Sequence, residues 1–382
     1  MPKKWYTTAR NFRLGILRLN SFILSSRELS KLAVMALLST AAFGLSGLIM
    51  ILIMQLMTMQ SYATDSVDKH GISEVKASRL GGVAVAIGVL VSMGFLLING
   101  YRGSNTLASL WIFWPLWLGM FGCFFLGLLE DLRNNSLSPR DRLLSKSLIL
   151  LIVFISSPDL VLSSIGLWGI DWLLGFSWMA LLVTLFFSVG FINAVNTVDG
   201  ANGLVSGIFA ITCFIFSNEI DGLALKSGLY GASLFLIFNV ISGRLFLGDA
   251  GSYGIGSAML LSGLVALNLG IVSLPFLAAL YFYPCFDFSV SLLRRWHSGA
   301  SLTAPDNDHL HNRINVFFRG IFRSKNMANS ATGLSIALGS SGMVLFIYLA
   351  HYISLTSNLW LWVFGFQCAL YGLIFMNIGK LK

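Results

Sequence analysis

The sequence predicts an all-α polytopic membrane protein with about eleven transmembrane helices. Of its 382 residues, 56% are hydrophobic and 11% are charged, whereas a soluble domain carries about a quarter charged residues. The apolar residues form long runs such as 32–57, which contains no charged side chain. A transmembrane helix needs about 20 mostly apolar residues. Because the runs do not alternate with a period of two, they indicate helices and not a membrane β-barrel.

Eleven stretches are candidate membrane spans, and the alternative count is ten. The fourth and sixth are short and could be tilted, broken or partly interfacial, while Pro275 and Pro284 predict kinks in the ninth. The candidates are 32–57, 80–99, 107–129, 143–157, 173–194, 203–217, 227–242, 254–269, 271–292, 330–351 and 357–378. We divide the chain into a basic amphipathic segment at 1–31, a single integral-membrane domain at 32–378 and a short basic tail at 379–382.

The basic residues are distributed unevenly between the loops. Odd-numbered loops hold fourteen Lys and Arg residues and even-numbered loops hold two, so the positive-inside rule places the odd loops in the cytoplasm. Eleven spans put the N-terminus outside, although residues 1–31 carry seven basic residues; either this is tolerated or the count is off by one. The net charge of +9 points to topology and to an anionic lipid or substrate, not to nucleic acid.

The third loop begins with two adjacent carboxylates, Glu130 and Asp131. Adjacent carboxylates repel each other, so such a pair favours a nearby cation or divides into one charged and one protonated group. The alternative is an ordinary solvated helix end with Arg133 as the partner.

The fifth loop holds Asn193, Asn196 and Asp199, spaced by three residues. They share one face if the preceding helix continues to this point. Amide and carboxylate oxygens on one face suit a hard cation, or a sugar or base edge. The alternative is a capped helix end, where Asp and Asn are common.

The seventh loop holds Asp249 between Gly248 and Gly251, with Ser252 next and Asn239 on the incoming span. The glycines permit close backbone approach and positive φ. The backbone N–H groups at the following helix start can face a phosphate.

The ninth and first loops add basic groups. His309 and His311 lie near Arg294, Arg295 and Arg313, a set that fits an anionic diphosphate better than zinc, and the alternative is a solvated basic loop. The first loop contributes Asp68, His70, Lys76 and Arg79. Together the odd loops offer oxygen ligands for a Mg²⁺-like ion and donors for phosphate, which suits phosphoryl transfer from a nucleotide.

These motifs, in this order, resemble the polyprenyl-phosphate N-acetylhexosamine-1-phosphate transferases of glycosyltransferase family 4, in particular undecaprenyl-phosphate N-acetylglucosamine-1-phosphate transferases. The resemblance runs from about Asp68 to Arg313. The family's acidic pair falls on Glu130 and Asp131, and its histidine motif on His309 and His311. Its NxxDGxDG and FxGDxGS motifs, with the asparagine upstream of the latter, fall on Asn196, Asp199, Asn202, Asn239, Phe246, Gly248, Asp249, Gly251 and Ser252.

The resemblance implies transfer of N-acetylhexosamine-1-phosphate from a UDP-sugar to polyprenyl (undecaprenyl) phosphate, with release of UMP, as the initiating step of a cell-surface polysaccharide. It implies a multi-pass protein of the bacterial inner membrane with a cytoplasmic active site, and a homodimer. Mg²⁺, with Mn²⁺ as a substitute, would be held by Asn196 and Asp249. Glu130, Asp131 and Asp249 would be catalytic, and the substrates would be bound by Lys76, Asn193, Asp199, Asn202, Asn239, His309, His311 and Arg313.

Three departures from the family pattern are Glu130 and Asn202 in place of Asp, and Asn312 where a further histidine is frequent. They argue against the peptidoglycan enzyme and for a surface-polysaccharide initiator, such as that of O-antigen in lipopolysaccharide. Two alternatives are a secondary transporter of an anionic substrate and a catalytically inactive scaffold of the same fold. A transporter carries ionisable residues within its spans, and here Asp287 is the main one. It could line the cytoplasmic mouth or pair with Arg294.

Overall fold

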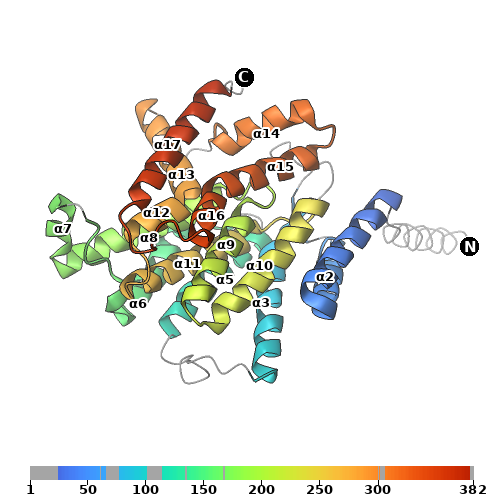
Figure 1. Ribbon diagram of the computed structural model, residues 1–382, viewed down its shortest axis with the longest axis horizontal. Helices are drawn as coiled ribbons and strands as arrows, with labels where there is room; N and C mark the ends of the chain where they lie inside the picture. The colour runs from blue at the N-terminus through green and yellow to red at the C-terminus, as the bar shows by residue number, and fades with distance from the viewer. Residues whose placement is uncertain are drawn as a thin grey trace, which may run out of the picture.

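The computed structural model describes residues 25–60, 62–65, 77–100, 114–133, 136–166, 168–299, 301 and 306–378. Within these residues the protein is an all-α polytopic membrane protein, as predicted, with a bundle of helices that cross one another (Figure 1). The one described sheet is a small antiparallel pair of β1 (Thr64–Asp65) and β2 (Ala77–Ser78). The predicted segment at 1–31 lies largely, and the tail at 379–382 wholly, outside the described residues.

The helices follow the predicted spans closely. The long ones are α2 (Ser26–Met57), α3 (Gly81–Ile98), α5 (Trp114–Arg133), α6 (Pro139–Ser156), α8 (Ser177–Thr197), α9 (Leu204–Glu219), α10 (Leu223–Ser242), α11 (Gly248–Asn268), α13 (Phe282–His297), α15 (Lys325–Ala337) and α17 (Trp360–Asn377). The short ones are η2 (Pro158–Leu160), α7 (Trp168–Leu174), α12 (Leu274–Leu280), α14 (Leu310–Ile321), η3 (Leu338–Gly342) and α16 (Met343–Leu349). In the described part of the chain, eight helices are long and apolar enough to cross a membrane, or nine if α12 and α13 form one bent span. The predicted total of eleven spans is reached only if α6 and α9 also cross the membrane, so it stays a prediction.

Local sequence explains where several helices begin. Ser25 and Glu28 form a capping box at the start of α2, which therefore begins at Ser26, six residues before the predicted span. Ser138 and Asp141 form a second capping box at the start of α6, with Pro139 at its first position. In the ninth span the predicted kink is present, because α12 and α13 meet at 79°. Pro284 lies in the first turn of α13, where its missing N–H costs no helical hydrogen bond.

The odd-numbered loops meet at one end of the helix bundle. The Ser78 N–H donates to the Arg244 carbonyl at 2.9 Å, and the Gly81 N–H donates to the Phe246 carbonyl at 2.9 Å. These bonds join the first loop to the seventh. The Asn202 amide donates to the Asn326 Oδ1 atom at 2.9 Å, which joins the fifth loop to the ninth. The predicted grouping of the polar loops on one side of the membrane is therefore present, and its cytoplasmic orientation stays a prediction.

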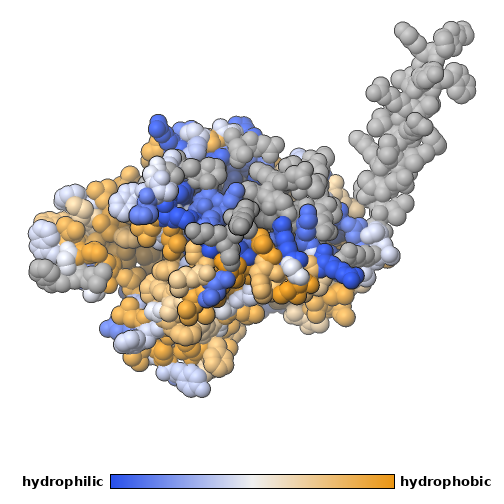
Figure 2. Space-filling view, turned by 90° about the horizontal axis from the view of Figure 1, so that it is seen from above, coloured by the Kyte–Doolittle hydropathy of each residue, from blue (hydrophilic) through white to orange (hydrophobic). Residues whose placement is uncertain are grey.

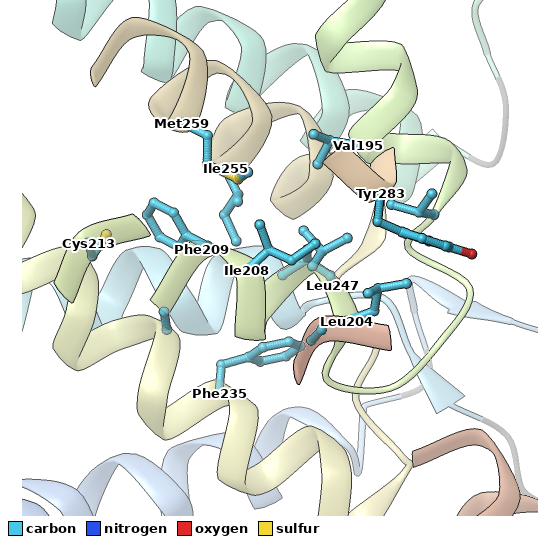
Figure 3. Close-up of a cluster of buried hydrophobic side chains, with 14 of the residues drawn as sticks. Val195, Leu204, Ile208, Phe209, Cys213, Phe235, Leu247, Ile255, Met259 and Tyr283 are labelled. Carbon is cyan, nitrogen blue, oxygen red and sulfur yellow. The ribbon is translucent and has the colours of Figure 1, made fainter. Parts of the chain in front are cut away.

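Beneath these loops lies an apolar core centred on α11, the most deeply buried candidate span (Figure 3). Ile255 and Met259 of α11 face Val195 of α8 and Ile208 and Phe209 of α9. Large apolar side chains also cover much of the molecular surface, while hydrophilic residues gather in one region of the face in Figure 2. This distribution fits helices that face lipid around a polar end.

Candidate active site

Asp131 holds the start of α11. The N–H groups of Asp249 and Ala250 donate to its two carboxylate oxygens at 3.0 and 2.8 Å, and the side chain is fully buried. The Arg79 guanidinium lies 3.8 Å from the same carboxylate. Asp131 thus caps a neighbouring helix, in the way a capping side chain satisfies free N–H groups. The prediction that these N–H groups face a phosphate is wrong, because Asp131 occupies them.

The glycines of the seventh loop serve helix packing. Gly248 has φ of +71°, and a Cβ atom there would lie 2.6 Å from an Asp131 oxygen. A Cβ atom on Gly251 would lie 2.9 Å from the Cα atom of Gly82, so α3 and α11 touch through their backbones. The predicted positive φ and close approach are both confirmed, and the neighbour that approaches is a helix of the same chain.

The carboxylate of Asp249 stands in contrast to that of Asp131. Asp249 is partly buried in the first turn of α11, and no side chain or N–H group in the described part of the chain donates a hydrogen bond to its carboxylate. It lies close enough to interact electrostatically with Arg79, Arg142 and Lys146. Three cations and the Glu130 carboxylate therefore act electrostatically on a carboxylate that accepts no hydrogen bond from the described residues.

Asp199 completes a cluster of carboxylates with Asp131 and Asp249. Burial raises the pKa of Asp199 well above its usual value, and the charges of Asp249 and Asp131 raise it further, while Arg79 and the Gly248 amide act in the opposite direction. Helix α8 ends at Thr197. The condition under which Asp199 would share a helical face with Asn193 and Asn196 is therefore not met, and the loop after α8 brings it to the site.

Glu130 closes the turn between α5 and α6. Its buried carboxylate accepts from the Leu137 N–H at 2.8 Å and the Ser136 hydroxyl at 3.2 Å, and the Arg142 guanidinium lies 2.8 Å away. The predicted cation partner exists, but it is Arg142 and not Arg133, which is exposed. The glutamate side chain thereby reaches across the third loop to the residues just before α6.

Asn193 and Asn196 both lie on α8 and face different partners. Asn196 accepts from the Ser252 hydroxyl at 2.6 Å, which places it beside the first turn of α11. Asn193 accepts from the ammonium group of Lys146. Lys146 is 1% exposed and its Nζ atom lies 4.1 Å from the centre of the Tyr253 ring. The sequence reasoning missed this lysine as a site residue, although a charge within the apolar run 143–157 was a signal for it.

Asn202 and Asn239 form a buried polar network under the fifth loop. Asn239 accepts from the Gly203 N–H at 2.7 Å and donates to the Leu245 carbonyl at 2.8 Å. The Asn202 amide binds Asn326 and also the Ser330 hydroxyl, the latter at 3.3 Å. In this structure the two side chains hold loops together, and their predicted contact with substrate stays a prediction.

The two histidines of the ninth loop are buried and stacked. Their ring centres lie 5.3 Å apart with 10° between the planes. His309 Nδ1 lies 2.7 Å from Asp287, and His311 Nδ1 lies 3.2 Å from the Tyr283 hydroxyl. Burial lowers the pKa of His311 to about 4. A Cβ atom on Gly200 would lie 3.4 Å from His311 Nε2, so His311 reaches the fifth loop.

The arginines of the ninth loop are bound within the protein. Arg313 pairs with both oxygens of Asp308, at 2.7 and 2.8 Å, donates to the Phe375 carbonyl and stacks on the Phe375 ring. Arg294 pairs with Asp306. The alternative that Asp287 pairs with Arg294 is therefore wrong. Arg313 ties α14 to α17, and its predicted substrate contact stays a prediction.

The loops thus bring most of the predicted residues together. Those around the start of α11 are Glu130, Asp131, Asn196, Asp199 and Asp249. Lys76, with Asp68 and His70, lies outside the described residues. No group of three His, Cys, Asp or Glu side chains in the described ranges could hold a metal ion by itself. A cation at Asp249 would therefore need amide oxygens or ligands from a substrate.

The region that carries most of these loops is similar to known proteins. Residues 113–267 match glycosyl transferase family 4. Over these residues the chain is similar to members of that family. The family 4 region covers α5 to α11, and therefore Glu130, Asp131, Asn196 and Asp249. The resemblance drawn from the sequence motifs is confirmed.

Three curated proteins are similar to the chain. A probable undecaprenyl-phosphate N-acetylglucosaminyl 1-phosphate transferase of Bacillus subtilis is 25% identical over 67% of this chain and 70% of its own length. A phospho-N-acetylmuramoyl-pentapeptide-transferase of Listeria welshimeri is 30% identical over 47% of this chain and 58% of its own length. A decaprenyl-phosphate N-acetylglucosaminephosphotransferase of Mycobacterium tuberculosis is 32% identical over 35% of this chain and 40% of its own length.

Proposed function

We propose that the protein transfers N-acetylhexosamine-1-phosphate from a UDP-sugar to polyprenyl phosphate and releases UMP. The names of the three relatives describe transferases of a phosphorylated sugar, two of them to a polyprenyl phosphate. The observation that carries the proposal is the Asp249 carboxylate. It accepts no hydrogen bond from the described residues, it interacts electrostatically with three cations and with Glu130, and it sits where the first, third, fifth and seventh loops meet.

The residues around Asp249 fit a Mg²⁺ ion whose remaining ligands come from a substrate. Mg²⁺ is usually bound by one or two carboxylates, with waters and substrate phosphates as the other ligands. Asp249 offers a carboxylate, and Asn196, beside the first turn of α11, offers an amide oxygen with a second lone pair. When bound, Mg²⁺ would neutralise charge on the diphosphate. We propose Asp249 and Asn196 as its protein ligands, and Mn²⁺ as a substitute.

The reaction needs little proton transfer. An oxygen of the lipid phosphate attacks the phosphorus that carries the sugar; a new P–O bond forms, and the bond to the oxygen shared with UMP breaks. A phosphate monoester has a second pKa of about 6, so the lipid phosphate is mostly ionised near pH 7. Glu130 accepts from the Leu137 N–H and pairs with Arg142, and both oxygens of Asp131 accept from N–H groups of α11. We therefore assign them the positioning of the loops around Asp249, and orientation carries much of the rate.

The reaction would initiate a cell-surface polysaccharide at the cytoplasmic face of a bacterial inner membrane. Glu130 and Asn202 differ from the family pattern, which favours a surface polysaccharide such as O-antigen over peptidoglycan. A panel of UDP-N-acetylhexosamines, with the lipid product identified by mass, would name the sugar.

The test is UMP release by the purified protein with a UDP-N-acetylhexosamine, polyprenyl phosphate and Mg²⁺. Asp249→Asn keeps the shape of the side chain and removes the charge, so we expect kcat to fall by about 10²–10³-fold, the range for loss of one electrostatic stabiliser. Chelation should abolish release by the wild-type protein, and added Mg²⁺ or Mn²⁺ should restore it.

Asp221→Asn is the matched control. Asp221 is an exposed carboxylate between the end of α9 and the start of α10, and it pairs with Lys226. These helix ends lie away from the candidate site, so the substitution should leave UMP release unchanged. Near wild-type turnover in Asp249→Asn would contradict the metal assignment. No UMP from the wild-type protein with any sugar of the panel would contradict the transferase proposal, and would favour a transporter or an inactive scaffold.

A further inference from the structure

Asp287 is a buried carboxylate on which three helices meet. It lies on α13 and is 1% exposed. It accepts from the Leu310 N–H at the start of α14 at 3.0 Å, and from the Tyr371 hydroxyl of α17 at 2.8 Å. Its other oxygen lies 2.7 Å from Nδ1 of His309. An ionised carboxylate only accepts hydrogen bonds, so three converging donors fit the ionised form.

This contact decides which nitrogen of His309 carries the proton. Because the carboxylate accepts, Nδ1 of His309 is the donor, and Nε2 is the nitrogen that remains. No described residue forms a hydrogen bond with that Nε2 atom. The ring is also held parallel to His311, which reaches Gly200 of the fifth loop. One nitrogen of His309 is therefore fixed and the other is available.

We propose that Asp287, itself held by Tyr371, is a positioning residue that fixes His309 through Nδ1 and leaves Nε2 facing the substrate, where, once protonated, it donates to a phosphate oxygen. The proposal rests on the proposed transferase function, and it extends that function to two residues outside the sequence motifs. The carboxylate also stabilises the positive charge that the ring carries when both of its nitrogens donate.

The neighbouring groups leave this role to His309. Burial holds the pKa of His311 at about 4, so its ring is neutral near pH 7. The guanidinium groups of Arg294 and Arg313 are paired with Asp306 and Asp308. A carboxylate within an apolar helix is costly unless it is bonded and used. A helix cap for Leu310 alone would require neither the imidazole nor the phenol.

The first experiment reads the histidine directly and requires no turnover. In protein labelled with ¹⁵N-histidine, the His309 signal is assigned by its loss in His309→Gln. We expect a protonated Nδ1 in the wild-type protein and a shift toward Nε2 protonation in Asp287→Asn. An unprotonated Nδ1 in the wild-type protein, or an unchanged spectrum in Asp287→Asn, would overturn the proposal. If the Nδ1 proton is found but the wild-type protein releases no UMP, the transferase proposal fails and the positioning of His309 stands.

The second experiment is a kinetic double-mutant cycle on UMP release. Asp287→Asn should lower kcat/KM by about 10- to 100-fold, as for carboxylates that orient metal-binding histidines, and His309→Gln should lower it at least as much. If Asp287 acts through His309, the double variant should be no worse than His309→Gln alone. Additive losses would show an independent structural role and overturn the proposal.

Tyr371→Phe keeps the experiment decisive if Asp287→Asn fails to fold. It removes one donor to Asp287 and keeps the ring contacts with Phe286 and Phe375, and we expect a loss of several-fold in kcat/KM. Tyr281→Phe is the matched control, because its buried hydroxyl donates to the Met259 carbonyl at 3.0 Å, away from the histidines. It should leave kcat/KM within about twofold; equal effects of the two substitutions would contradict the proposal.

Discussion

The four acidic side chains at the site differ in the partners they already have. Glu130 accepts a hydrogen bond from the turn after α5, and Asp131 accepts two from the first N–H groups of α11. The Asp249 carboxylate accepts no hydrogen bond from the described residues, and Asp199 has the Gly248 N–H as a donor. The sequence could predict these positions from motifs, but not this division, because the N–H groups bound by Asp131 lie 118 and 119 residues away in the chain. Lys146 escaped prediction for the same reason, since its partner Asn193 lies 47 residues away.

At the residue scale, Asp199 should make stability depend on pH. Its pKa is raised in the folded protein and is about 3.9 when unfolded. The charged form is therefore penalised on folding, and stability is lost as pH rises from the unfolded pKa through the folded one. In metal-free buffer, Asp199→Asn should melt at a higher temperature than the wild-type protein at pH 8, and the gap should close as pH falls toward about 4. Thermal unfolding in detergent at several pH values measures this.

The control for that measurement is Asp159→Asn, which changes an exposed carboxylate in η2, remote in the chain from the fifth loop. Its melting temperature should follow that of the wild-type protein at every pH. A destabilised Asp199→Asn at pH 8 would mean that the carboxylate makes a favourable bond in the folded protein, against the direction of its pKa.

At the scale of elements, apolar runs predicted nearly every helix, while their ends depended on capping residues and glycines. The span predicted at 254–269 begins six residues earlier as α11, because Asp131 supplies a cap that no local sequence encodes. Similarly, a shared helical face for Asp199 required the preceding helix to continue to it, and α8 ends at Thr197. Helix ends set by partners from distant segments are outside the reach of a periodic pattern.

The contact between α3 and α11 gives a test at this scale. A Cβ atom on Gly82 would collide with the backbone of Gly251, whereas one on Gly94, on the same helix, would meet nothing within 4 Å. Gly82→Ala should cost about 1–3 kcal/mol of unfolding free energy through overpacking. Gly94→Ala should be neutral or stabilising by up to about 1 kcal/mol, the helix preference of Ala over Gly. The free energies come from denaturant unfolding; equal values would contradict a backbone contact between the helices.

At the scale of the whole molecule, the odd-numbered loops define one polar end, and the candidate site is built from all of them. Residues from the first, third, fifth and seventh loops surround the start of α11, and His311 of the ninth lies against the fifth. Charge counting along the sequence predicted this grouping because topology follows basic residues. It could not predict which loops touch, since that depends on how α3, α5 and α8 pack around α11.

The orientation of this polar end in the membrane is the remaining prediction. In a variant whose four native cysteines are replaced, single cysteines at Asp221 and Thr356 lie in even-numbered loops, and those at Ser298 and Met327 lie in the ninth loop; all four positions are exposed. An impermeant maleimide should label the first two on intact cells, and label the last two only after the membrane is permeabilised, because the positive-inside rule predicts that the odd loops, with their fourteen basic residues, face the cytoplasm. The opposite labelling would place the candidate site outside the cell, away from cytoplasmic UDP-sugars, and would contradict the proposed function together with the topology.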